Sequence, residues 1–174
     1  MRSRFWMLAC CVAGLTSLAS TSSDAAKTRP SFGLVQAFQG RTYGVGAFSA
    51  PLFGIHRTVR TTLTGSLSGR QLTVFEKIDF TDGERQRKTW RFTKVAPGEW
   101  VGRRADVVGL AKATEQDGVV TLTYDAHVSS SALGDTVLSF YDVIYRRADG
   151  KVVNETTVSK FGIPVGSVSL LFRR

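Results

Sequence analysis

The stretch VTLTYDAHV, residues 120–128, alternates apolar and polar side chains along its whole length. A period of two is typical of a β-strand with one buried face and one solvated face. The segment therefore predicts an amphipathic strand in which Tyr124 lies on the apolar face. His127 falls on the polar face, which makes it a poor haem ligand.

The same period recurs from about Tyr43 to the end of the sequence. Further strands are predicted at 58–67, 72–80, 90–92, 99–105, 137–146, 152–158 and 168–172. Pairs typical of tight turns separate them, about ten residues apart: Ser68-Gly69, Asp82-Gly83, Pro97-Gly98, Asp117-Gly118 and Asp149-Gly150. A short helical turn is expected only at 32–38.

Eight to ten consecutive strands joined by short hairpins predict an all-β fold, an antiparallel up-and-down β-barrel of the lipocalin-like kind. Closing the sheet removes both exposed edges, and a barrel of about eight strands can enclose one small ligand. A β-sandwich is the alternative. It is disfavoured because no long Greek-key connection interrupts the hairpins.

The first residues have the pattern of an export signal. Arg2 and Arg4 precede an apolar run at 5–18, and the small residues around Ala19 fit a cleavage site. We therefore expect a signal peptide at 1–19, a flexible tether at 20–30 and one barrel domain at 31–174, in a periplasmic protein. Cys10, after Leu8-Ala9, leaves lipoprotein anchoring as an alternative.

Composition excludes several kinds of site. The 23 Lys and Arg against 14 Asp and Glu give a formal net charge of +9. Both cysteines, Cys10 and Cys11, lie in the expected signal, and the two histidines are His56 and His127. These numbers argue against a zinc site, a catalytic thiol or a disulfide in the mature domain. We expect no cofactor, no metal, and no recognisable catalytic motif.

Two carboxylates interrupt the apolar faces. Glu76 has the parity of Val74 and Ile78, and Asp142 has the parity of Phe140 and Ile144. Both are therefore expected inside the barrel, where an unpaired charge is costly. Their role is open between buried ion pairs or a water-filled mouth, polar anchors for an apolar ligand, and general acid/base catalysis.

Cationic partners for these acids are available on inward positions. Lys88 shares the face of Trp90 and Phe92, and Arg104 has the parity of Trp100. Either cation is a candidate partner for Glu76 or Asp142.

The opposite face of the same strand carries Arg85, Arg87 and Arg91. These arginines are either a docking stripe for an anionic membrane surface or a solvated outer face. Nucleic acid is not expected as a partner, because Trp90 and Phe92 point the other way and cannot stack on bases from that face.

Three blocks of the sequence resemble a bacterial family of domains of unknown function, family 3833. They are residues 75–90, with Glu76, Asp82-Gly83-Glu84 and Trp90, then 102–113 and 159–166. The resemblance covers most of 38–172. It implies a lipocalin-like barrel of the bacterial envelope and carries no established activity.

The combined expectation is a monomeric exported barrel that binds or shields a lipid-like small molecule. Alternatives are an enzyme that modifies a lipid by acid/base chemistry and a non-catalytic, membrane-associated assembly factor. The expected ligand-binding residues are Glu76, Trp90, Phe92, Tyr124, Phe140 and Asp142. The expected membrane-surface residues are Arg85, Arg87 and Arg91.

Overall fold

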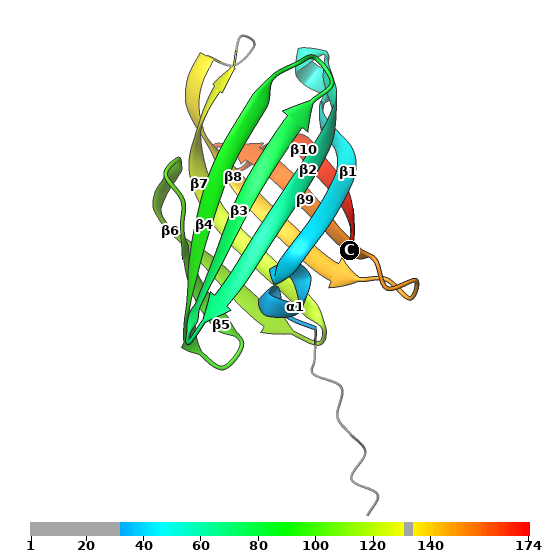
Figure 1. Ribbon diagram of the computed structural model, residues 1–174. Helices are drawn as coiled ribbons and strands as arrows, with labels where there is room; N and C mark the ends of the chain where they lie inside the picture. Colours follow the sequence, from blue (N-terminus) through cyan, green and yellow to red (C-terminus); the bar gives the residue numbers. More distant parts are fainter. Residues whose placement is uncertain (1–31, 131–133) are drawn as a thin grey trace, which may run out of the picture.

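The computed structural model describes residues 32–130 and 134–174, so the expected signal peptide and tether lie outside the described residues. The described chain forms a barrel with one short helix beneath it (Figure 1). The elements are α1 (Leu34–Phe38), β1 (Gly40–Ala50), η1 (Pro51–Phe53), β2 (Ile55–Ser68), β3 (Gln71–Phe80), β4 (Arg85–Ala96), β5 (Glu99–Arg103), β6 (Val107–Gln116), β7 (Val119–Ser130), β8 (Gly134–Arg146), β9 (Val152–Lys160) and β10 (Ile163–Arg173).

The sheet is a closed, antiparallel, up-and-down barrel of ten strands. Each strand pairs with its neighbours in sequence, and β1 also pairs with β10, for example Tyr43 with Arg173. This closure confirms the predicted barrel and excludes the sandwich, in which two sheets would keep free edges. The expected helical turn at 32–38 is present as α1.

The predicted turn pairs join the hairpins as expected. The five glycines of these pairs all have φ between +55° and +94°, a region that side chains with a Cβ rarely adopt. At the β6–β7 turn Asp117 also has a positive φ of 51°, as in the tightest hairpin connections. Local sequence therefore determines where the chain reverses.

One predicted strand was too long. The run 99–105 ends as β5 at Arg103, and residues 104–106 form a turn in which the Val107 amide donates to the Arg104 carbonyl. Pairing between β4 and β5 accordingly stops at Arg91–Arg103, so the half of β4 from Arg85 to Trp90 has no partner on that side. This interruption of the sheet positions part of the candidate site.

Helix α1 closes one end of the barrel. Its Leu34, Ala37 and Phe38 are buried against the core. A Cβ on Gly65 of β2 would lie 1.9 Å from the Phe38 carbonyl oxygen, so this helix can approach the wall only because position 65 is glycine.

A half-buried carboxylate ties the helix to the sheet. Glu115 of β6 accepts hydrogen bonds from the backbone amide of Leu34 and from the indole Nε1 of Trp100, each at 2.8 Å. The first bond satisfies an amide of the first helical turn, which has no partner within the helix.

Replacing Glu115 with alanine removes both bonds and leaves two donors without a partner. We expect the free energy of unfolding to fall by about 3 kcal/mol, as measured by urea denaturation. Glu99→Ala is the matched control, because Glu99 is exposed on neighbouring β5. Equal losses in the two variants would show that Glu115 does not hold the helix.

Candidate functional site

The barrel encloses a cavity of about 450 Å³. It extends from Phe38 of α1 to the opposite end of the barrel, where Asp82 and Glu84 of the β3–β4 turn are about half exposed. Pockets that bind small molecules typically have volumes of roughly 300–1,000 Å³. The interior is therefore large enough for a ligand and is open at the end away from α1.

Four aromatic side chains form one continuous wall of this cavity. Trp90 and Phe92 of β4 stack with ring centres 5.0 Å apart, and Tyr124 of β7 meets Trp90 edge-on at 5.1 Å. Phe140 of β8 stacks on Tyr124 at 4.9 Å. All four line the cavity, so the structure brings together the aromatic residues that parity placed on the apolar faces.

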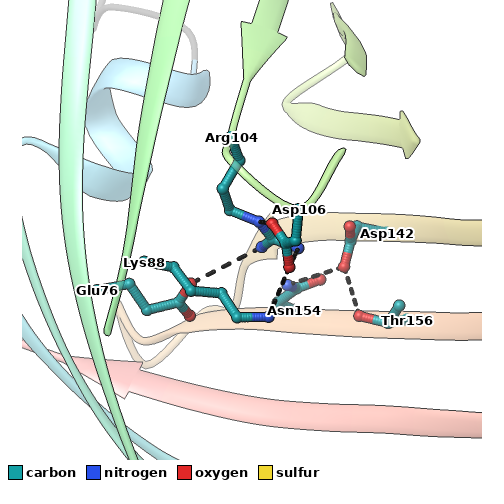
Figure 2. A network of polar contacts seen from close by, with 7 residues as sticks. All are labelled: Glu76, Lys88, Arg104, Asp106, Asp142, Asn154 and Thr156. Atoms are coloured by element: carbon teal, nitrogen blue, oxygen red, sulfur yellow. Dashed lines mark hydrogen bonds and ion pairs between the residues drawn. The ribbon is translucent and has the colours of Figure 1, made fainter. Parts of the chain in front are cut away.

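The two interrupting carboxylates also line the cavity. Asp142 is only 3% exposed, and the side chain of Glu76 is 15% exposed. They come from β8 and β3, on different parts of the wall. Figure 2 shows two neighbouring polar groups, one of Glu76, Lys88, Arg104 and Asp106 and one of Asp142, Asn154 and Thr156, which we together call the polar network.

Arg104 is the central cation of this network. Its guanidinium donates to both carboxylate oxygens of Asp106, at 2.6 and 3.2 Å, and lies 4.0 Å from Glu76. The same group lies over the rings of Trp90, at 4.3 Å, and Tyr124, at 5.1 Å. Bidentate pairing and aromatic contact both suit the planar guanidinium.

Lys88 does not pair with either predicted acid. It lies opposite Glu76 in the β3–β4 register, yet its Nζ bonds Asp106 at 2.8 Å. Asp106 therefore bridges two cations, and these cations lower the pKa of its carboxyl although burial opposes the shift. This bridge lies where β4 lacks a strand partner, so side chains connect the sheet across the interruption.

Asp142 is held by neutral donors. Its Oδ1 accepts from the Thr156 hydroxyl and, at 3.1 Å, from the Asn154 amide, both on neighbouring β9. Burial raises the pKa of Asp142 from 3.8 to about 6, and the two hydrogen bonds only partly oppose that rise. Burial likewise raises the pKa of Glu76, against the attraction of Arg104 and Lys88.

These shifts define the chemistry that the network can support. A carboxyl with a pKa near 6 can take up or release a proton close to neutral pH. The same carboxylates can instead accept hydrogen bonds from a polar group placed in the cavity.

A second set of charges surrounds the open end. Arg57 of β2 bonds Asp82 at 2.7 Å and Glu84 at 2.7 Å, and its guanidinium lies 3.8 Å from the centre of the Phe80 ring. Arg57 lowers the pKa of the Asp82 carboxyl, and that of Glu84 is lowered by Gln86 and Arg57.

The predicted membrane-surface arginines lie outside the barrel. Arg85, Arg87 and Arg91 are all exposed on β4. Lys77 is the cross-strand neighbour of Arg87, and Arg103 that of Arg91. We call these five residues the basic patch; Asp79, 3.6 Å from Arg85, is an acid beside it.

Sequence reasoning missed three members of the interior network. Asp106 lies in a turn, one residue beyond the predicted strand 99–105, so parity gave no direction for its side chain. Asn154 and Thr156 have the parity of the buried residues Val152 and Val158. Their positions opposite Ile144 and Asp142 could have identified them once the β8–β9 register was known.

Within residues 32–130 and 134–174, no group of three or more His, Cys, Asp or Glu side chains is arranged to hold a metal ion. No helix in the same part of the chain is long and apolar enough to cross a membrane.

Fold and site together define a closed ten-stranded up-and-down barrel with an internal cavity. The chain belongs to the DUF3833 family of proteins of unknown function, whose family model matches residues 10–174. Among solved structures it is similar to Rv2717c from M. tuberculosis, with 17% identity and a TM-score of 0.56 over 80% of this chain and 94% of that one. No curated protein matches in sequence.

Asp142 should make stability depend on pH. The folded chain keeps a proton on Asp142 up to about pH 6, whereas the unfolded chain releases it near 3.8. The folded state binds more protons between these values, so this group's contribution to stability falls as pH rises through that window. Compared with Asp142→Asn, the wild type should lose about 2 kcal/mol between pH of about 4 and about 7.

Urea denaturation of both proteins across this pH range measures the difference. The comparison with the variant isolates Asp142, because Asp106, with its lowered pKa, shifts stability in the opposite sense in both proteins. Asp125→Asn, on the exposed face of β7, is the control and should track the wild type. A pH-independent difference between wild type and Asp142→Asn would contradict the burial effect.

Proposed function

We propose that this protein binds or shields a lipid-like ligand in the barrel. The observation that carries the proposal is the cavity of about 450 Å³ with a continuous aromatic wall and a polar network at one side of it. An apolar chain that enters such a space gains about 0.8 kcal/mol for each methylene it buries. The polar network then orients the other end of the ligand.

We further propose that the protein works in the cell envelope. This rests on the export pattern of residues 1–19, which lie outside the described part of the chain. An envelope location would place the barrel beside membranes and their lipids.

Native mass spectrometry of protein purified from a bacterial envelope, followed by lipid extraction, tests the proposal directly. We expect one apolar molecule bound per chain. Recovery of empty protein, together with no affinity for any single-chain amphiphile in titrations, would overturn the proposal.

Filling the cavity should weaken binding without changing the outer surface. Ala126 of β7 is buried and lines the cavity, so Ala126→Trp displaces part of the ligand. Displacing two methylenes costs about 1.6 kcal/mol, which predicts a loss of affinity of more than about tenfold. Affinity is measured by displacement of a neutral fluorescent probe.

Thr123→Trp is the matched control, because Thr123 is exposed on the same strand. It should keep the affinity of the wild type. Urea denaturation of both variants separates a filled cavity from a failure to fold. Full affinity in a folded Ala126→Trp protein would mean that the ligand binds elsewhere.

The basic patch favours a second candidate function, contact with an anionic membrane surface. Its five cations lie on adjacent strands and face solvent. Near an anionic bilayer each such residue contributes about 1 kcal/mol. A barrel that rests on the membrane could exchange its ligand there.

Reversing three charges of the patch should release the protein from vesicles. The triple variant Arg85→Glu, Arg87→Glu and Arg91→Glu is expected to lose at least about 100-fold in affinity for phosphatidylglycerol vesicles. Wild-type binding should weaken as salt is added. The readout is vesicle co-sedimentation.

The control reverses three exposed cations elsewhere, Arg41 of β1, Arg173 of β10 and Lys151 of the β8–β9 connection. It changes the net charge by the same amount and should lose less binding. Equal losses of vesicle affinity in the two variants would mean that overall charge, and not the basic patch, causes binding. Unchanged vesicle binding of the Arg85, Arg87 and Arg91 variant would exclude docking through the patch.

A further inference from the structure

The cavity carries a charge balance opposite to that of the whole chain. The chain has a formal net charge of +9. Among the described residues that line the cavity, however, carboxyls outnumber cations by five to three. The carboxyls are Glu76, Asp82, Glu84, Asp106 and Asp142, and the cations are Arg57, Lys88 and Arg104.

Each of the three cations is already bonded to a carboxylate. Arg57 donates to Asp82 and Glu84. Lys88 and Arg104 both bond Asp106, and the Arg104 guanidinium also lies against the rings of Trp90 and Tyr124. An anionic head group would have to break one of these ion pairs to gain a cationic partner. The carboxylate that lost its cation would then lie close to the head group and repel it.

The acceptors of the network are less well satisfied. Asn154 Oδ1 is buried and makes no hydrogen bond. Both hydrogen bonds to Asp142 reach its Oδ1, and the described residues supply no donor to Oδ2. Glu76 has Arg104 at 4.0 Å and no hydrogen bond within the described chain. An unsatisfied buried acceptor costs roughly 1–3 kcal/mol.

We propose that the ligand's polar end is a hydrogen-bond donor with no negative charge, and that a protonated primary amine on a single apolar chain fits best. The inference rests on the proposed function and specifies the ligand class of the same cavity. An ammonium group carries three donors and no acceptor. It therefore supplies both the positive charge and the donors that Glu76 and Asp142 lack.

The alternative head groups follow in a definite order. An alcohol brings one donor and no charge, so it meets part of the need without relieving the excess of carboxylates. A carboxylate brings only acceptors and a like charge, which disfavours it beside ionised carboxylates in a buried site. The structure thus ranks amine above alcohol and alcohol above acid.

A matched series of twelve-carbon probes tests this ranking at neutral pH. Dodecylamine, dodecanol and dodecanoate are compared by displacement of the neutral probe N-phenyl-1-naphthylamine from the full chain. We expect the amine to bind at least about tenfold more tightly than the acid, a difference of about one charged hydrogen bond. The alcohol should lie between them.

The outcomes separate this inference from the function beneath it. Tightest binding of the acid, or equal affinities in the series, would overturn the preference for an amine while leaving a lipid-binding barrel. Failure of all three probes to bind would overturn both proposals. Only the order amine, alcohol, acid supports both.

Asp142→Asn removes one carboxylate and keeps the side-chain shape. It should cut the advantage of the amine over the alcohol about tenfold, because loss of the charge weakens amine binding more than alcohol binding. Asp125→Asn, on the exposed face of β7, is the control and should keep the wild-type ratio. An unchanged ratio in Asp142→Asn would overturn the assigned role of this carboxylate.

If Asp142→Asn does not fold, the wild type provides the same test through pH. The amine remains protonated across the range, whereas Asp142 becomes protonated below about pH 6. The advantage of the amine over the alcohol should therefore shrink as pH falls through that value. A ratio that stays constant would count against the proposal in the same way.

Discussion

The pairing of β1 with β10 is the constraint on which the rest of the structure depends. Once the sheet is closed, alternate side chains along each regular stretch of strand point into one shared interior, and a side chain turns outward only where the register shifts, as it does in β4, β6 and β10. Glu76 and Asp142 are therefore held inside together with the apolar residues of their strands. The chain accommodates these acids with neutral donors on β9 beside Asp142 and with Arg104, from the β5–β6 turn, near Glu76, rather than by exposing them.

The interruption between β4 and β5 has the largest consequence for the site. Because β5 ends at Arg103, three residues cross to β6 without joining the sheet, and they bring Arg104 and Asp106 toward Trp90 and Lys88. An ion-paired cluster thus connects the wall where backbone pairing stops. It also occupies the cations, so under the proposed function the carboxylates of Asp142 and Glu76 are the groups left to meet a ligand. The charge that the cavity presents therefore depends on which side chains are ion-paired as well as on which side chains line it.

Much of this arrangement follows from patterns that can be read locally. Alternation along 120–128 and the neighbouring strands gave the correct barrel, and the aromatic residues at inward positions do line one cavity. Prediction was weaker where a residue's direction depends on its neighbours in space. Lys88 has the expected parity but bonds Asp106 instead of Glu76. This partner could not be predicted, because Asp106 lies in a turn and a turn has no alternating pattern.

The sequence by itself determined the strand faces, the turns and hence the closed barrel, because alternation and glycine-containing turns act over a few residues. The tertiary structure alone decided that Asp106 would bridge two cations, that Thr156 and Asn154 would meet Asp142, and that a space of about 450 Å³ would remain unfilled. These features depend on register and on where β5 ends. Register relates residues far apart in the chain, so no local period contains it.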